Sequence, residues 1–430
     1  MDDNKKLKIL WVDDEIEHLR SHIIFLEEKG IDVKTARKGT AAISLMDDER
    51  YDLVFLDENM PGLSGLETLS RLKNVRPATP VVMITKSEEE DIMDQAIGSK
   101  ISDYLIKPVK PNQILSSIKR NVDRQRLVAE KATSDYQAEF SDLGFRMNDR
   151  LSLDEWKEVY RKLVYWELEL ENADSPMDDV LKMQKGEANQ LFARTVKNHY
   201  AEWLNDDEGP MMSHRIMKDY VLPKLDGGEK VVMIVIDNFR LDQWEAIRHD
   251  IRSMFEVTAD DIFCSILPTA TQYARNAMFA GLLPADIQQN YPHLWTEEED
   301  EGGRNQYEEE LLGTFFKRLR RSYTYSYHKI SDNETGRKLV ENYSQIKDKD
   351  LTVFVFNFVD MLSHARTEVK MIRELAADES AYRSLTRSWF LHSPLFDLLK
   401  KLADEKVSVV LTSDHGDVRV QHPVKVIGDR

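Results

Sequence analysis

The chain has 430 residues, a formal net charge of -18 and one cysteine, Cys264. This length accommodates two or three domains, and the negative charge disfavours a surface that neutralises the phosphates of duplex DNA. One cysteine excludes an internal disulfide framework. Neither a signal peptide nor an apolar stretch long enough to span a bilayer is visible, so we expect a soluble cytoplasmic protein without a membrane partner.

The first 124 residues predict a parallel sheet covered by helices. Short apolar runs end in Asp13 and Asp14, in Asp57, in Thr85 and in Lys107. The stretches between these runs carry helical apolar spacing, so strand and helix alternate as in a doubly wound α/β fold. Because the carboxyl ends of parallel strands meet at one edge, we expect the three aspartates to lie together.

This predicted edge has the chemistry of phosphoryl transfer. Three carboxylates repel one another unless a hard cation lies among them, and Mg²⁺ prefers oxygen ligands of this kind. Lys107 would supply positive charge for the transferred phosphoryl oxygens, and Thr85 a hydroxyl donor. Tyr104 is an aromatic side chain able to turn inward or outward.

Over residues 5 to about 124 these motifs resemble the receiver domain of response regulators. The resemblance implies a flavodoxin-like fold in which Mg²⁺ is held by the three aspartates and a sensor histidine kinase phosphorylates Asp57. It also implies that Thr85 and Tyr104 act as switch residues and that the face formed by residues 104–122 is reshaped for a phosphorylation-dependent homodimer. A flavodoxin-like domain with incidental acids is the alternative, which the ordered motif positions disfavour.

Residues 125–225 predict a helical bundle that links two domains. Gly and Pro are sparse there, and charged residues alternate with large apolar ones at helical spacing. Helix breaks are expected at Gly144, residues 172–176 and residues 206–210, and Ser152 is the expected cap of a helix. We interpret the bundle as a spacer that transmits motion, with a core stripe made of Trp156, Tyr160, Leu163 and Trp166.

A second α/β domain is predicted from residue 226 to 430. Its apolar runs end in Asp237, in Asp360 and just before Asp414 and His415. His364 stands four residues after Asp360, on the same side of a helical turn, so the two side chains are able to share a cation. Mixed Asp and His ligands favour Zn²⁺ or another transition metal over Mg²⁺.

A threonine-containing segment lies between the first two of these acids. Pro268 keeps the residue before it extended, and Thr271 is expected near the start of a helix. A hydroxyl there points into unpaired backbone N–H groups, and a metal could lower its pKa enough to make it a nucleophile toward a phosphate ester. Thr269 is the alternative nucleophile, and Thr271 is preferred because it lies nearer the helix start.

In order and strand-end context these residues resemble the alkaline phosphatase superfamily. The whole chain resembles the PorX-like response regulators, which join a receiver domain to a PglZ domain and are associated with type IX secretion in Bacteroidetes. The resemblance implies two Zn²⁺ ions, one bound by Asp237, Asp414 and His415 with Thr271 as a further ligand, and one bound by Asp360 and His364.

The same resemblance implies an enzyme. Thr271 would be the catalytic residue of a zinc-dependent phosphodiesterase and would form a transient phosphothreonine. The implied substrates are phosphodiesters such as oligonucleotides or cyclic nucleotides. Phosphorylation of Asp57 would reach this output domain through the helical bundle.

One histidine of the superfamily pattern is absent. A further histidine normally completes the second metal site well after the Asp-His pair, but the sequence reaches Arg430 without one at that spacing, and His422 is expected to be a loop residue. Either the chain is incomplete or the second site is weakened. Because the chain stops in an apolar-rich stretch, residues 424–427, we expect a C-terminally incomplete domain.

The alternative function is a catalytically weak PglZ-like module that binds a partner, such as a sigma factor or a secretion component. The absent histidine and the acidic composition favour it. A DNA-binding activator is disfavoured because no basic helix-turn-helix segment is visible.

Several charged or polar residues are expected to have only structural roles. Asn238, Arg240 and Arg275 are interpreted as surface residues or ion-pair partners. The acidic stretches 297–301 and 308–310 are expected to be solvated loop and helix faces.

Overall fold

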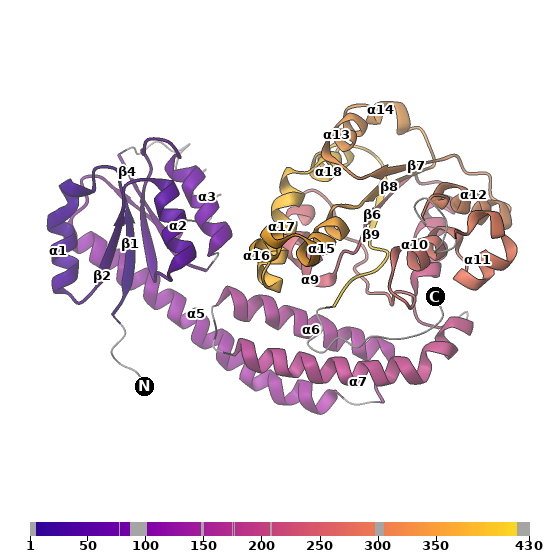
Figure 1. The fold of residues 1–430 in the computed structure, drawn as a ribbon, viewed down its shortest axis with the longest axis horizontal. Helices are drawn as coiled ribbons and strands as arrows, with labels where there is room; N and C mark the ends of the chain where they lie inside the picture. The colour runs from indigo at the N-terminus through magenta and orange to yellow at the C-terminus, as the bar shows by residue number, and fades with distance from the viewer. Residues whose placement is uncertain are drawn as a thin grey trace. The chain divides into compact units, whose positions relative to one another are not determined.

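The computed structural model describes residues 6–76, 78–86, 101–147, 150–173, 175, 177–206, 209–296 and 305–418. The chain divides into two compact units, one of residues 1–148 and 165–190, and one of residues 149–164 and 191–430 (Figure 1). Among the helices described, none has both the length and the apolar composition needed to cross a membrane.

The first unit contains a parallel sheet with strand order β2-β1-β3-β4-β5. Its strands are β1 (Lys8–Val12), β2 (Asp32–Ala36), β3 (Leu53–Asp57), β4 (Val81–Thr85) and β5 (Asp103–Ile106). This order is that of the flavodoxin-like doubly wound fold, so the predicted fold class is confirmed. Both β3 and β4 are buried along their whole length, which explains their uninterrupted apolar sequences.

Helices cover both faces of this sheet. One face packs against α2 (Gly39–Asp48) and α3 (Gly65–Val75). The other packs against η1 (Ile16–Leu19), α1 (Arg20–Glu28) and the start of α5 (Pro111–Arg146). The alternate faces of β3 supply both cores, since Val54 and Leu56 belong to the first and Leu53 and Phe55 to the second.

Three long helices follow the sheet in sequence: α5, α6 (Leu153–Asn172) and α7 (Asp178–Asn205). The helix break predicted at Gly144 is wrong, because α5 continues through this residue to Arg146. An isolated glycine costs a helix only about 1 kcal/mol relative to alanine, and this position is exposed. The cap predicted at Ser152 is confirmed, since its hydroxyl accepts a hydrogen bond from the Glu155 amide.

The core stripe predicted on α6 is only partly correct. Tyr160 is 40% exposed, whereas the other predicted stripe residues are buried. The buried face of α6 is centred elsewhere, so Tyr160 lies at its edge. This face is made of Trp156, Val159, Leu163, Trp166 and Leu170.

The second unit contains a parallel sheet with strand order β7-β8-β6-β9. Its strands are β6 (Val231–Ile236), β7 (Tyr325–Ile330), β8 (Leu351–Phe356) and β9 (Ser408–Thr412). The two central strands, β8 and β6, are buried throughout. Helices lie on both faces, as expected for the predicted alkaline-phosphatase-like α/β domain.

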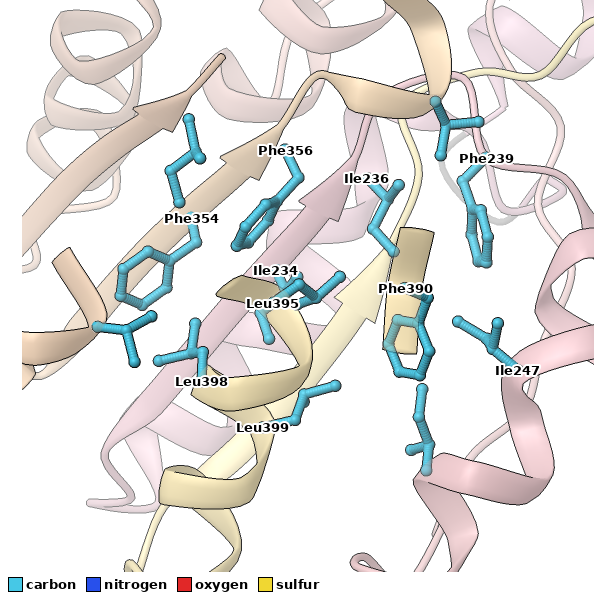
Figure 2. Close-up of a cluster of buried hydrophobic side chains, with 14 of the residues drawn as sticks. Ile234, Ile236, Phe239, Ile247, Phe354, Phe356, Phe390, Leu395, Leu398 and Leu399 are labelled. Atoms are coloured by element: carbon cyan, nitrogen blue, oxygen red, sulfur yellow. The ribbon is translucent and has the colours of Figure 1, made fainter. Parts of the chain in front are cut away.

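Two apolar clusters sandwich this sheet. Figure 2 shows one of them, in which Phe390, Leu395 and Leu398 pack against side chains of β6 and β8. The helices with this cluster are α9 (Leu241–Arg252), α13 (Asn333–Glu341), α14 (Tyr343–Ile346), α15 (Phe358–Glu368), α16 (Lys370–Leu375), α17 (Glu379–His392) and α18 (Pro394–Ala403). On the other side lie η2 (Ser213–Arg215), η3 (Met217–Val221), α8 (Leu222–Asp226), α10 (Thr271–Ala280), α11 (Pro284–Asn290), η4 (Pro292–Leu294) and α12 (Glu308–Arg318).

The apolar run before Asp360 is not a single strand. β8 ends at Phe356, and Asp360 lies in the first turn of α15 rather than at a strand end. A continuous apolar run does not by itself distinguish a buried strand from the start of a buried helix. His422, residues 424–427 and the acidic stretch 297–301 lie outside the described residues.

Candidate active site

Acids and a histidine gather at the carboxyl edge of the second sheet. Asp237 directly follows β6, His415 lies shortly after β9, and Asp360 lies in the helix that follows β8. One ligand atom from each of these three residues lies within 4.8 Å of the other two. Asp237 and His415 are buried and Asp360 is half-buried. Parallel strands direct their following residues to one edge, which explains the convergence.

Thr271 is the first residue of α10 and lies against this cluster. Its Oγ1 is 3.1 Å from His415 Nε2, and it donates a hydrogen bond of 3.4 Å to Asp237 Oδ1. The Asn305 side chain donates to the Thr271 carbonyl oxygen at 3.1 Å and so anchors this end of the helix. Thr269 is exposed and precedes the helix. Of the two threonines, Thr271 is therefore the one that contacts the cluster.

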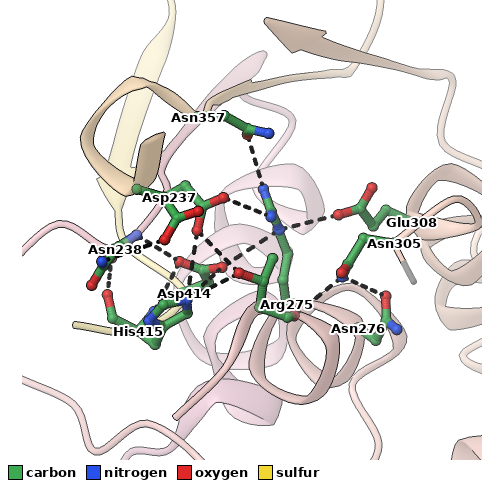
Figure 3. A network of polar contacts seen from close by, with 12 residues as sticks. Asp237, Asn238, Arg275, Asn276, Asn305, Glu308, Asn357, Asp414 and His415 are labelled. Carbon is green, nitrogen blue, oxygen red and sulfur yellow. Dashed lines mark hydrogen bonds and ion pairs between the residues drawn. The ribbon is translucent and has the colours of Figure 1, made fainter. Parts of the chain in front are cut away.

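Arg275 follows one turn later on α10 and is almost completely buried, with 1% exposure. Its guanidinium lies 2.8 Å from Asp237 Oδ2, 3.5 Å from Asp414 Oδ2 and 3.1 Å from Glu308 Oε1 (Figure 3). Burial opposes its charge, but Asp414, Asp237 and Glu308 together raise the pKa of Arg275. Arg275 is therefore an internal cation that partly compensates three buried carboxylates.

Glu308 corrects a sequence prediction. It was expected on a solvated helix face, yet it is 1% exposed and pairs with Arg275 and, at 3.4 Å, with Lys329. Glu308 begins α12, which packs beside α10, and so it points inward. A run of glutamates carries no signal that distinguishes its first member, because the difference depends on Arg275 in a distant segment.

The electrostatics of the cluster favour the binding of a further positive charge. Burial, together with the Asp414 and Asp360 carboxylates, raises the pKa of Asp237 to about 8 despite Arg275. Two other polar atoms there, Asp414 Oδ2 and Asn238 Oδ1, are buried without a hydrogen bond. Carboxylate oxygens and an imidazole nitrogen form a donor set that fits Zn²⁺ or a similar transition metal.

The remaining predicted ligands lie beside the trio. Asp414 Oδ1 accepts hydrogen bonds from the amides of Asn238, at 3.2 Å, and His415, at 2.9 Å, while its Oδ2 faces Arg275. His364 Nε2 is 3.6 Å from Asp360 Oδ2, on an exposed side chain. The three closest ligands thus include members of both predicted metal sets.

Two further residues shape the site. Asn238 is buried with φ of 59°, a left-handed conformation that asparagine tolerates, and its Nδ2 lies 3.4 Å from Asp360 Oδ1. Arg240 is an ion-pair partner, as one reading of the sequence proposed. It binds Asp242 and Asp417, each at 2.8 Å, and thereby ties the segment after His415 to α9.

The first sheet carries its own acidic site. Ligand atoms of Asp13, Asp14 and Asp57 lie within 4.8 Å of one another. Lys107 Nζ is 3.0 Å from Asp13 Oδ2 and 2.8 Å from Asp57 Oδ1. Burial raises the pKa of Asp57, although Lys107 opposes this shift. Three convergent carboxylates fit Mg²⁺.

The predicted switch residues flank this site. Thr85 is buried and donates a hydrogen bond to Glu58. Tyr104 is 37% exposed. The strand ends thus bring the predicted acids and Lys107 together, while the aromatic ring of Tyr104 is partly accessible to solvent.

Family models match three successive parts of the chain. Residues 9–119 match the response regulator receiver domain and residues 126–204 the PorX response regulator linker domain. Residues 216–430, half of the chain, match the BREX system PglZ alkaline phosphatase-like domain. The chain belongs to the PglZ family, in an architecture that joins a response regulator receiver to the PglZ domain through a PorX-type linker. Receiver domains typically bind Mg²⁺, and alkaline phosphatase-like domains use metals.

Curated relatives are similar over about a quarter of the chain. The transcriptional regulatory protein ResD of Bacillus subtilis is 34% identical over 119 residues, which are 28% of this chain and 49% of ResD. The CpxR homolog of Haemophilus influenzae is 38% identical over 114 residues, 26% of this chain and 48% of the relative. The chain thus spans about half the length of these relatives.

A solved structure shows the same local similarity. The CheY-like response regulator receiver domain protein from Methanospirillum hungatei JF-1 is 27% identical and has a TM-score of 0.28. The match covers 28% of this chain and 98% of that one.

Proposed function

We propose that this chain is a two-component response regulator phosphorylated on Asp57 by a sensor histidine kinase, with a zinc-dependent phosphodiesterase as its output domain. The observation that carries the enzymatic part is the position of Thr271. Its hydroxyl lies at the start of α10, 3.1 Å from His415 Nε2, beside a trio of metal-ligand types of which Asp237 and His415 are buried.

Asp237, Asp360 and His415 would hold zinc, with Asp414 and His364 next to them. Zinc bound there would lower the pKa of the Thr271 hydroxyl and stabilise negative charge on the phosphoryl group. The second zinc expected from the family resemblance would use Asp360 and His364, which lie 3.6 Å apart.

The proposed reaction has two chemical steps, attack by Thr271 on phosphorus and hydrolysis of the resulting phosphothreonine. Thr271 Oγ1 gives up its proton to solvent and forms a bond to phosphorus while the bond to the leaving oxygen breaks, and the leaving alcohol takes up a proton from solvent. Water then attacks the phosphothreonine, restoring the threonine and releasing a phosphomonoester. Arg275 holds Asp237 through its Oδ2 and leaves Oδ1 directed toward Thr271.

The substrate class and the biological role rest on resemblance. Nucleotide pyrophosphatases use a similar threonine and Asp/His set, which supports a phosphodiester of the nucleotide or oligonucleotide class. The match of residues 126–204 to the PorX linker supports regulation of type IX secretion. We propose that phosphorylation of Asp57 promotes a homodimer through the receiver domain (1–124) and acts through the helical bundle (125–225) on the PglZ domain (226–430).

The test compares metal content and turnover in purified full-length protein. We expect bound zinc, and hydrolysis of bis(p-nitrophenyl) phosphate in preference to p-nitrophenyl phosphate. Thr271→Ala should retain zinc and lose activity by about 10³-fold or more, because the nucleophile is removed. Asp360→Ala should lose zinc as well, and Thr269→Ala is the matched control with unchanged activity.

Absence of both zinc and turnover in the wild-type protein would contradict the enzymatic proposal. It would favour the second candidate, a partner-binding module for a sigma factor or a secretion component. That candidate has structural support on α15 and α16 and in the short segment between them. Large apolar side chains are exposed there by 46–67%, namely Met361, Val369, Met371 and Leu375.

A further inference from the structure

A tyrosine of the linker holds the segment that leads into α10. Residues 264–270 form no regular helix or strand and end at Thr271, the first residue of α10. Tyr200 lies near the end of α7. Its hydroxyl accepts a hydrogen bond of 2.7 Å from the Leu267 amide and donates one of 3.5 Å to the Leu267 carbonyl oxygen. One side chain therefore binds both polar groups of the Leu267 backbone.

The two residues before Leu267 are also fixed. Ser265 Oγ donates a hydrogen bond of 3.2 Å to the carbonyl oxygen of Asp414, the residue before His415. The Ile266 amide donates one of 3.2 Å to Ser213 Oγ. The segment is thus bound both to α7 and to the residues that follow β9, so a shift of Leu267 would reach the catalytic cluster along two routes.

Little slack separates Leu267 from Thr271. The Ala270 amide donates a hydrogen bond of 2.8 Å to the Pro268 carbonyl oxygen, which closes a tight turn between them. Thr271 Oγ1 in turn lies 3.1 Å from His415 Nε2. A reacting group that moves by about 1 Å can lose about 100-fold in rate, so the position of this turn matters for the proposed attack on phosphorus.

The ring and the hydroxyl of Tyr200 make separate contacts. The ring packs, together with Trp203 and Leu204 of α7, against an apolar cluster that includes Ile266 and Ala277 of α10. The hydroxyl makes the two bonds to Leu267. Replacement of Tyr200 by phenylalanine therefore removes the hydrogen bonds and keeps the apolar contact.

Tyr200 and its partner come from different family segments. Tyr200 lies within residues 126–204, which match the PorX linker, whereas Leu267 and Thr271 lie within residues 216–430, which match the PglZ domain. All three belong to the second compact unit. Because α7 is one continuous helix, Asp178–Asn205, a displacement of its axis would be carried to Tyr200.

We propose that Tyr200 is a positioning residue, through which the linker helix α7 holds Thr271 at the metal-ligand cluster. The PglZ domain then depends on the linker for the alignment of its nucleophile, and movement of α7 acts on the site at this point. The inference rests on the proposed phosphodiesterase and names a residue through which it is regulated.

The test compares purified full-length wild-type protein with Tyr200→Phe. We expect kcat for bis(p-nitrophenyl) phosphate to fall by about 10- to 100-fold, because Thr271 loses its alignment, while KM and bound zinc stay unchanged. Tyr165→Phe is the matched control, since it removes the hydroxyl of a linker tyrosine that is 53% exposed on α6. It should leave kcat at the wild-type value.

Hydrogen exchange followed by mass spectrometry gives a second readout that needs no turnover. In Tyr200→Phe the amides of residues 264–271 should exchange faster by about 2- to 10-fold, the effect of one lost hydrogen bond. Exchange in the buried strand β6 should not change, which shows that the second sheet is intact. Tyr165→Phe should match the wild-type protein in both segments.

The outcomes separate this inference from the proposed function. An unchanged kcat in Tyr200→Phe overturns the positioning role and leaves the phosphodiesterase intact. Loss of zinc, or faster exchange shared with β6, would mean a general loss of structure and would also overturn it. If the wild-type protein has no turnover, the phosphodiesterase fails and exchange decides: a rise confined to residues 264–271 supports the role of Tyr200, and no rise overturns it.

Discussion

The molecule contains two acidic sites, each at the carboxyl edge of a parallel sheet, and they differ in the cation that the chain itself supplies. In the first unit Lys107 reaches Asp13 and Asp57 from the end of β5, with a side chain that is 18% exposed. In the second unit Arg275 is 1% exposed and is fixed by Asp237, Asp414 and Glu308.

This difference shows how one topological position serves two kinds of chemistry. A lysine ammonium is a compact, mobile charge that can follow an arriving phosphoryl group, whereas a guanidinium held by several carboxylates has a fixed orientation. The first site offers only carboxylates, which suit Mg²⁺, while the histidine of the second suits zinc. Residue type at the strand ends, and not the fold alone, separates a proposed phosphoryl acceptor from a proposed catalytic centre.

The largest expected effect that separates the two sites is loss of phosphorylation in Asp57→Asn. An amide lacks the nucleophilic carboxylate, so labelling by acetyl phosphate with Mg²⁺ should fall to background on a phosphate-affinity gel. Zinc content should not change, because the second site is built from other residues. Asp47→Asn, at an exposed acid on α2, is the control and should be labelled normally. Labelling of Asp57→Asn at the wild-type level would place the acceptor elsewhere.

The next effect concerns stability in zinc-free protein. Arg275→Met leaves three buried carboxylates without their internal cation and should lower the free energy of unfolding by about 3–5 kcal/mol. Lys107→Met should cost less than Arg275→Met without Mg²⁺, since the Lys107 side chain is 18% exposed and so is better hydrated than Arg275. Urea unfolding of the two variants and the wild-type protein measures both changes in the free energy of unfolding.

The stability of Arg275→Met should also depend on added zinc. Zinc should recover part of the stability lost in Arg275→Met, because a bound cation replaces the missing charge. Arg275→Lys keeps the positive charge but loses the planar guanidinium that contacts several carboxylates at once. Its free energy of unfolding should therefore lie between those of the wild-type protein and Arg275→Met. Equal stability of Arg275→Met and the wild-type protein would show that Arg275 does not compensate the cluster.

The smallest expected effect is a pH-dependent contribution to stability from Asp242, a residue of the second unit that is not a proposed metal ligand. Burial opposes ionisation of Asp242, but Arg240 and Arg383 hold its pKa below the usual 3.8. A carboxyl with a lowered folded-state pKa stabilises the protein above pH 3.8, and this contribution is lost as pH falls through the folded-state pKa. Asp242→Asn should therefore cost about 2 kcal/mol at pH 7.

The difference between the wild-type protein and Asp242→Asn should narrow as the pH falls below 3.8. Unfolding curves from pH 7 to pH 3 measure it. A difference that is constant over this range would mean that the Asp242 charge contributes nothing and that the variant acts through shape alone.

Local sequence patterns predicted most of the strands and the residues that follow them. An apolar run of strand length that ends in an acid is a local signal, which is why Asp57 and Asp237 were placed correctly at strand ends. The same signal misplaced Asp360, because Phe358 and Val359 extend the apolar run into α15. Apolar composition reports burial and not the element that is buried.

By itself, the sequence determined the two parallel sheets and the ligand types at their edges, because strand length, apolar runs and the residues that follow them are adjacent in the chain. Only the tertiary structure decided that Glu308 and Arg275 turn inward and which three ligands lie closest together. The physical reason is that desolvation of a side chain, and the charge that compensates it, depend on partners far away in sequence.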